Sequence, residues 1–242
     1  MPSFAQRHHT EEMMDDFTIV DERLATALDN LRYVNRFLGG YATAMAVLAP
    51  LLRAHPSGDL LRVLDLATGA ADFPGFLVRW ADRRDREVEI VALDANAATV
   101  AYARQALDRD LPSHLRPRVR VEVGDALALP YDDDAFDVCV ASLFMHHLKH
   151  DEAVTLVREM ARVARLGLVV NDLHRHRLAY YSIRALAAVL PVSPMFRHDG
   201  PVSVLRGFKR DELRAIAEAA GLDAYRIRWH WAFRWTLSHF NI

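Results

Sequence analysis

Cysteine is nearly absent from this chain, since Cys139 is the only one among its 242 residues. A lone cysteine cannot form an intramolecular disulfide, so packing must hold the fold together, and a reducing compartment is expected. Long apolar runs are missing too. The longest, residues 42–52, contains Thr43 and Pro50 and is too short to span a bilayer. Residues 1–12 are polar and lack the apolar stretch of a secretion signal. We therefore expect a soluble, cytoplasmic protein without an integral membrane segment.

Neither sign of charge is in excess. The chain has 30 basic residues of the Lys and Arg type and 32 acidic ones, a net charge of −2. A general nucleic-acid binder carries a basic surface, so we expect no nucleic-acid partner. Hydrophobic residues make up 52% of the chain, which is enough for a sizeable core. The length suits one domain with additions.

Short apolar runs alternate with helical stripes through the middle of the chain. The runs that predict strands are residues 61–66, 88–93, 119–123, 136–141 and 166–170, with two more at 225–229 and 234–240. This alternation predicts an α/β fold with a mostly parallel sheet covered by helices on both faces. We place the main domain at residues 60–242.

Two further segments lie outside this alternation. Residues 1–59 are predicted as an N-terminal helical lid, with Pro50 kinking or shortening its last helix. Residues 173–208 are predicted as a cap insertion after the fifth strand, with a loop around Pro191, Pro194 and Pro201. Ligands of open α/β sheets bind beyond the carboxyl ends of the strands, where both segments would lie.

Small or acidic residues follow each of the first three strands. Asp65 to Asp72 form a turn of small residues, which allows close approach to a ligand or simply tight packing. Asp94 could accept both hydroxyls of a ribose or cap the next helix, as Asn96 could equally do. Asp125 could accept a hydrogen bond from an adenine amine or be a solvated turn residue. The three turns in this order indicate a nucleoside-containing ligand more strongly than any one alone.

With these motifs the chain resembles the class I S-adenosylmethionine (SAM) dependent methyltransferases, in the group similar to ubiquinone/menaquinone-biosynthesis enzymes. The stretches that carry the resemblance are Val63 to Asp72, with Ala71 in place of the family's last glycine, Val91 to Asp94, and Gly124 to Pro130 followed by Ala135 to Val138. The resemblance implies a Rossmann-like sheet of seven strands with a reversed last strand, and SAM as cofactor.

Roles for individual residues follow from the same resemblance. It implies that Asp65, Ala67 and Gly69 lie at the methionine end of SAM, and that Asp94 with Ala95 holds the ribose. Asp125 and Ala126 would contact the adenine, and Ser142 the amino acid moiety.

The segment after the fourth strand is where the resemblance places the transferred methyl group. It contains Met145, His146 and His147. A histidine titrates near neutral pH and could take a proton from a hydroxyl, or it could merely cap the loop. If the segment is extended, Met145 and His147 share one side. We therefore predict His147 as the base, with His146 as the other candidate and Met145 lining the acceptor pocket.

The fifth strand ends in unusually polar residues. Asp172 could act in catalysis or pair with an arginine, and His174 could contact the acceptor. We expect no metal, because Ser142 stands where metal-dependent catechol-type methyltransferases have an acidic ligand, and because His146, His147 and His150 lack the spacing of a zinc site.

These observations predict a SAM-dependent methyltransferase acting on a small, fairly apolar acceptor. O-methylation of an aromatic or polyketide-like phenol in specialised metabolism is our preferred interpretation. C-methylation of a quinone-type ring is the alternative within the same class. Two alternatives belong to other classes of protein: a non-catalytic SAM-binding protein and a nicotinamide-dependent oxidoreductase. The missing G-x-G-x-x-G motif disfavours the oxidoreductase. A monomer or a homodimer is expected.

Overall fold

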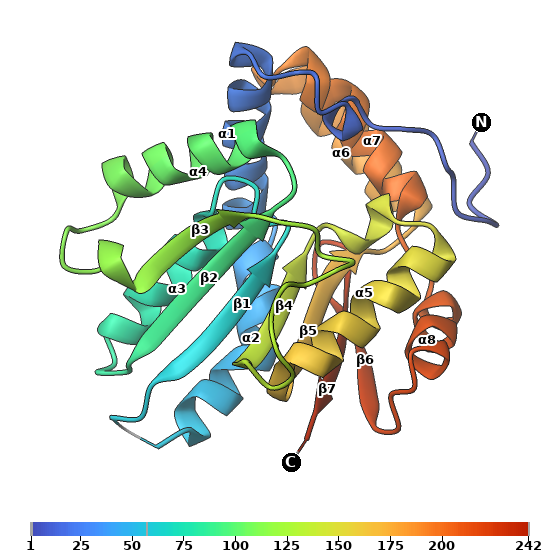
Figure 1. Cartoon of the computed structure of the whole chain (residues 1–242). Helices are drawn as coiled ribbons and strands as arrows, with labels where there is room; N and C mark the ends of the chain where they lie inside the picture. The colour runs from blue at the N-terminus through green and yellow to red at the C-terminus, as the bar shows by residue number, and fades with distance from the viewer. Residues whose placement is uncertain (1, 57, 242) are drawn as a thin grey trace.

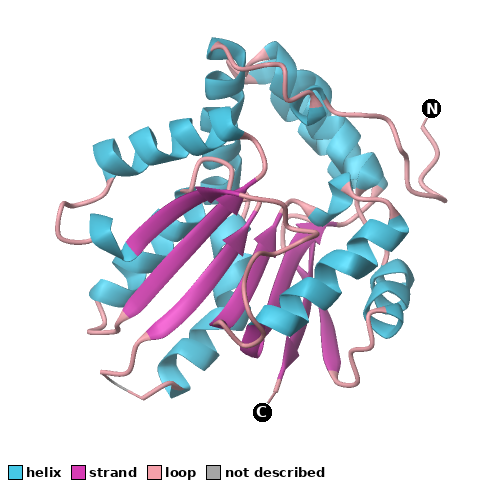
Figure 2. Ribbon diagram, in the orientation of Figure 1, coloured by secondary structure: helices cyan, strands magenta, loops and turns pink. Residues whose placement is uncertain are grey.

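A seven-stranded sheet runs through the centre of the protein, with helices on both of its faces (Figures 1 and 2). The computed structural model describes residues 2–56 and 58–241. The strands are β1 (Leu61–Leu66), β2 (Val88–Asp94), β3 (Val119–Val123), β4 (Phe136–Ser142), β5 (Ala164–Leu173), β6 (Tyr225–His230) and β7 (Arg234–Phe240). Their order is β3-β2-β1-β4-β5-β7-β6. The first five strands pair in parallel, and β7 pairs antiparallel with β5 and β6. The expected fold class is confirmed, including the reversed strand.

The helices fill the connections and add a cap. They are α1 (Glu22–Phe37), α2 (Gly40–Ala54), α3 (Asp72–Asp82), α4 (Ala97–Asp110), α5 (His150–Val163), α6 (Arg177–Val189), α7 (Pro194–Arg206) and α8 (Arg210–Ala219). Three short 3₁₀ helices are η1 (Met13–Asp15), η2 (Arg116–Arg118) and η3 (Met145–His147). In the described part of the chain no single helix is long and apolar enough to cross a membrane. By length and composition α1 and α2 qualify only as a pair, bent by 57°.

Alternate residues of the central strands supply two separate hydrophobic layers. In β4, Val138 and Val140 pack with α2, α3 and α4, whereas Cys139 and Ala141 pack with α5 and α8. Both faces of the strand are therefore apolar, as expected of a parallel strand covered on both sides. Cys139 is fully buried in the second layer.

Two proline-based predictions are wrong in part: the helix is not shortened at Pro50, and the expected loop is confined to the residues around Pro191. Helix α2 continues past Pro50 to Ala54, because its buried face, which includes Leu48 and Leu52, remains packed on the protein core. The expected loop around Pro194 and Pro201 is instead largely helix α7. Ser193 caps this helix by accepting a hydrogen bond from the N–H of Phe196, and Pro194 occupies its first turn, where proline costs no hydrogen bond.

The N-terminal segment before α1 is mainly an extended strap and not a helix. Residues 2–12 contain no helix, and the strap runs along α7 (Figure 1). Asp199 of α7 accepts hydrogen bonds from the N–H groups of Met13 (2.8 Å) and Met14 (3.1 Å). Arg7 donates to the carbonyl of Arg206 at 2.9 Å. The strap is therefore tied to the cap at several points.

Candidate active site

A cavity of about 1060 Å³ opens at the carboxyl ends of the strands. Its floor consists of the turns after β1, β2, β3 and β4, and its walls come from α1, α6, α7, the N-terminal strap and the turn between β6 and β7. The position is the one expected for a ligand in an open α/β sheet. The lid and the cap predicted from the sequence both border this cavity.

A hydrogen-bonded pair of turns forms one end of the cavity. Gly69, in the turn after β1, has a φ of +55°, and a Cβ there would meet only Leu28 at 3.7 Å. Its backbone N–H donates to Asp94 Oδ2 at 3.0 Å, and the N–H of Asn96 donates to Asp94 Oδ1 at 3.0 Å. Asn96 caps α4, so the capping role falls to Asn96 and leaves Asp94 at the cavity wall.

Most of the residues expected at the cofactor do border the cavity. The predicted cofactor residues that line it are Ala67, Gly69, Asp94, Ala95, Asp125, Ala126 and Ser142. Asp65 is different: it lies beneath the turn, is only 3% exposed, and does not line the cavity. Burial raises the pKa of Asp65 to about 7, and the carboxylates of Asp72 and Asp94 add to this rise. We correct its role from cofactor contact to support of the turn.

The segment after β4 is a 3₁₀ turn, so the extended geometry assumed for it is wrong. In η3, Met145 points into the hydrophobic layer under the sheet and is completely buried. It cannot contact an acceptor in this position. His146 and His147 both line the cavity.

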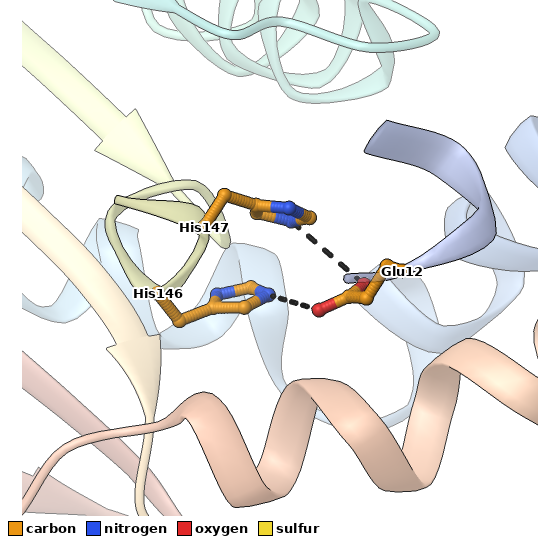
Figure 3. A group of neighbouring side chains, drawn as sticks. All are labelled: Glu12, His146 and His147. Atoms are coloured by element: carbon orange, nitrogen blue, oxygen red, sulfur yellow. Dashed lines mark ion pairs between the residues drawn. The ribbon is translucent and has the colours of Figure 1, made fainter. Parts of the chain in front are cut away.

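The two histidines are held by carboxylates on both sides. His146 Nδ1 lies 2.7 Å from Asp172 Oδ1, and His147 Nδ1 lies 2.6 Å from Asp15 Oδ1. The Nε2 atoms of both rings face Glu12, at 3.5 Å for His146 and 3.9 Å for His147 (Figure 3). The rings themselves are 4.3 Å apart between centroids. We call Glu12, His146 and His147 the histidine–glutamate cluster.

Charge around this cluster shifts several pKa values. Burial alone would lower the pKa of His146, but Asp172 and Glu12 outweigh it and raise that pKa to about 9. His146 without a ligand therefore carries a proton at neutral pH and cannot take another. Although burial opposes the change, the neighbouring histidines lower the pKa of Glu12, and His146 lowers that of Asp172.

Asp172 and His174 do not line the cavity, contrary to a direct role at the acceptor. Asp172 is 1% exposed and also accepts the backbone N–H of His146 at 3.0 Å, so it orients that residue from behind. His174 packs against Trp235 and accepts a hydrogen bond from the indole N–H of Trp229 at 3.2 Å. Burial, together with the nearby His176, lowers the pKa of His174 to about 4, so its ring is neutral.

Sequence reasoning missed the residues that complete the site from distant segments. Glu12 and Asp15 belong to the strap, and Arg206 of α7 pairs with Asp15 at 2.6 Å while donating to the carbonyl of His147 at 2.7 Å. Apolar side chains that line the same end include Phe17, Ile183, Leu186, Phe196, Val204, Trp231 and Phe233. No local pattern marks Glu12, since it lies in a polar, non-helical stretch.

Comparison with known proteins agrees with this geometry. A family model described as a methyltransferase domain matches residues 63–167, from β1 into β5. The demethylmenaquinone methyltransferase of Roseiflexus castenholzii is 33% identical over 128 residues, which are 53% of this chain and 46% of that protein. The ajmaline N-methyltransferase of Rauvolfia serpentina is 28% identical over 168 residues, 62% of this chain and 54% of that protein. The chain thus spans about half the length of these curated relatives.

Solved structures share the fold over most of the chain. Magnesium protoporphyrin IX methyltransferase from Synechocystis PCC 6803, solved with bound SAH, has a TM-score of 0.62 at 16% identity and covers 94% of this chain and 100% of its own. A SAM-dependent methyltransferase from Aquifex aeolicus has a TM-score of 0.57 at 17% identity, covering 81% of this chain and 90% of its own. Together with the sheet order and the three turns, these similarities show a match to a methyltransferase domain over residues 63–167 and the fold of SAM-dependent methyltransferases over most of the chain.

Proposed function

We propose that this protein transfers a methyl group from SAM to a phenolic oxygen of a small, largely apolar acceptor. The observation that carries the proposal is the single cavity that joins the three cofactor turns to the histidine–glutamate cluster. Its volume of about 1060 Å³ slightly exceeds the roughly 300–1,000 Å³ typical of sites for drug-sized ligands. Such a volume leaves room for a second molecule beside SAM.

The residues at the cofactor end fit SAM. Asp94 offers a carboxylate at the cavity wall, where the diol of a ribose can donate to it, and Asp125 offers a second one after β3. Gly69 has no side chain, and only Leu28 lies within 4 Å of where a Cβ would be, which lets a ligand approach the backbone closely. SAM supplies, when bound, an electrophilic methyl group on a sulfonium.

The other end fits a flat apolar molecule with one polar group. Ile183, Phe196 and Phe233 present apolar surface, whereas His147 presents an imidazole to the same space. An aromatic ring can pack on these apolar side chains while its hydroxyl reaches the imidazole of His147. A phenol has a pKa near 10, so its reaction at neutral pH needs a group that promotes loss of the proton.

In this reaction the protein holds the two reactants in position, keeps water away from them and provides a route for the acceptor's proton. The acceptor oxygen forms its new bond to the methyl carbon while the sulfur–carbon bond breaks and its electron pair stays on sulfur. The acceptor's proton passes to the solvent through the cluster, where the Asp15-bound ring of His147 is half-buried and borders the cavity. Holding the two reactants in line lowers the activation free energy by several kcal/mol, on the order of 7–11 kcal/mol in the best model systems.

Two other acceptors remain as alternatives within the same chemistry. C-methylation of a quinone-type ring is favoured by the relative described as a demethylmenaquinone methyltransferase, and N-methylation by the relative described as an ajmaline N-methyltransferase. The matches cover only 53% and 62% of this chain, so neither relative decides the acceptor.

A product analysis separates these possibilities. The protein is incubated with SAM bearing a deuterated methyl group and, separately, with a hydroxylated naphthalene, a naphthoquinol and a tertiary alkaloid amine. Mass spectrometry detects the label, and NMR assigns it to oxygen, carbon or nitrogen. We expect an aryl methyl ether. Label found only on carbon or nitrogen would contradict the phenol assignment, and calorimetric binding of NAD in place of SAM would contradict the proposed class.

A further inference from the structure

Both histidines of the histidine–glutamate cluster have one ring nitrogen already engaged. Asp172 holds Nδ1 of His146 at 2.7 Å, and Asp15 holds Nδ1 of His147 at 2.6 Å. The carboxylates accept hydrogen bonds from these nitrogens, which leaves the two Nε2 atoms with lone pairs when the rings are neutral. Carboxylate–histidine pairs of this kind typically orient imidazoles that bind a metal.

The two remaining ring nitrogens converge on one carboxylate. Figure 3 shows both rings, presented by the same short turn, pointing toward Glu12 from the strap. One ligand atom from each of Glu12, His146 and His147 lies within 4.8 Å of the other two. A metal ion lies about 2.0–2.2 Å from each ligand atom, so any two of its ligand atoms must lie closer together than roughly twice that length. The distances between the ligand atoms of this cluster approach that limit.

Two atoms at the centre of the cluster lack a hydrogen-bond partner. Glu12 Oε1 and His146 Nε2 are buried and make no hydrogen bond within the described part of the chain, and the contact between them is an ion pair at 3.5 Å, too long for a good hydrogen bond. Buried polar atoms that leave their hydrogen-bonding capacity unused are costly and uncommon in native structures, so a ligand between these two atoms would satisfy both. The second oxygen of Glu12 is fixed, because it accepts a hydrogen bond from Ser203 at 2.7 Å.

The charges around the cluster favour a cation at its centre. Glu12, Asp15 and Asp172 bring three carboxylates to the two imidazoles. Among residues 2–56 and 58–241, Arg206 is the one guanidinium within ion-pair distance of any of them. One guanidinium does not balance three carboxylates, and the remaining negative charge, which holds a proton on His146 in the ligand-free protein, would equally attract a metal cation in its place.

We propose that Glu12, His146 and His147 bind a divalent first-row transition metal ion at the acceptor end of the cavity. Two imidazoles and one carboxylate suit zinc, iron or cobalt better than magnesium, which prefers an all-oxygen site. Three protein ligands leave coordination positions open, and both histidines border the cavity. The expectation of no metal considered only ligands near β4 and β5, and it did not include the strap.

The role of this ion rests on the proposed function. An acceptor hydroxyl that occupies an open coordination position would lose its proton more readily, since a bound divalent cation lowers the pKa of an oxygen ligand strongly. The ion would thereby serve the purpose for which a histidine base was first considered.

Cobalt(II) titration tests the site without SAM or acceptor, so its outcome is independent of the methyl acceptor. The full chain is first treated with a chelator and then titrated with Co²⁺ while the visible absorption and the stoichiometry are followed. We expect one tight site, displaced by Zn²⁺ and unaffected by a large excess of Mg²⁺. Glu12→Gln should abolish this site, whereas Glu11→Gln, a change of the exposed neighbouring carboxylate, should leave it intact.

Two further measurements guard against misfolding and against binding elsewhere. Asp15→Asn retains all three ligands but loosens His147, so it should weaken Co²⁺ binding roughly 10- to 100-fold. In the unaltered protein, Co²⁺ should broaden or shift the imidazole NMR signals of His146 and His147 and spare those of His174 and His176. The proposal is wrong if Co²⁺ binds no tighter to the unaltered protein than to Glu12→Gln, or if other histidines carry the paramagnetic effect.

Discussion

Gly69 donates its backbone N–H to Oδ2 of Asp94 across 3.0 Å, so one hydrogen bond joins the turns that follow the first two strands. The same carboxylate therefore fixes the backbone of the cofactor end and presents its remaining lone pairs to the cavity. A change at Asp94 acts on both functions together.

Asp94→Ala should lower SAM affinity roughly 10- to 150-fold, the equivalent of the about 1.5–3 kcal/mol expected for hydrogen bonds to a charged group. Isothermal titration calorimetry measures this change. Asp223→Ala, which removes an exposed carboxylate near the end of α8, serves as the control. Unchanged SAM affinity in Asp94→Ala would refute the assignment of this residue to the ribose.

Stability of the ligand-free protein should depend on pH through Asp65. Its pKa is about 7 in the folded protein, against about 3.9 for an unperturbed aspartate, so the folded state binds more protons between these values. The contribution of Asp65 to the free energy of unfolding is therefore intact below about pH 4 and decreases as the pH rises toward 7.

Asp65→Asn removes this titration. The difference in unfolding free energy between the variant and the unaltered protein should shift in favour of the variant as the pH rises from 5 to 8. Urea unfolding at several pH values measures it. A difference that does not vary with pH would show that Asp65 does not titrate in this range.

Met145→Ala should destabilise the protein without altering the acceptor end. Met145 is completely buried, and truncation of such a side chain costs about 2–5 kcal/mol. We expect a lower free energy of unfolding in urea and an unchanged KM for any accepted phenol. A raised KM at unchanged stability would instead support the original interpretation of Met145 as an acceptor contact.

His147→Ala should lower the turnover number roughly 10²- to 10⁴-fold, the range for loss of a group that assists proton transfer. SAM affinity should change little, because the cofactor turns lie at the other end of the cavity. His150→Ala, at the exposed start of α5, is the matched control. Steady-state kinetics and calorimetry together distinguish this result from a general loss of structure.

Asp199→Ala should release the strap from α7. Two backbone N–H groups, those of Met13 and Met14, lose a charged acceptor, each bond contributing about 1.5–3 kcal/mol. We expect faster proteolysis before α1 and weaker Co²⁺ binding, while the sheet stays folded. Circular dichroism and limited proteolysis test this, and an unchanged cleavage rate would contradict the role of Asp199.

The sequence predicts the cofactor half of the molecule well because that half is locally encoded. Each strand is an apolar run that ends in a short turn, so Gly69, Asp94 and Asp125 are placed by their own neighbours. The exception is Asp65, whose burial depends on how the sheet and α3 pack around it.

The acceptor half resists such prediction because its geometry comes from distant contacts. Arg206 donates hydrogen bonds to the carbonyls of His146 and His147, and these support a 3₁₀ turn where an extended loop was expected. Glu12 reaches the histidines only because the strap is tied to α7. Neither interaction has a signature within a short window of sequence.

Apart from the turn after β4 that carries His146 and His147, the walls of the acceptor end lie outside residues 63–167, the part that matches the methyltransferase domain. Glu12, α6, α7 and the turn between β6 and β7 can therefore change in evolution without disturbing the strand turns that face the cofactor. Proteins that share the central domain are free to diverge in what they methylate, so acceptor choice in this group should follow the similarity of the strap and the cap.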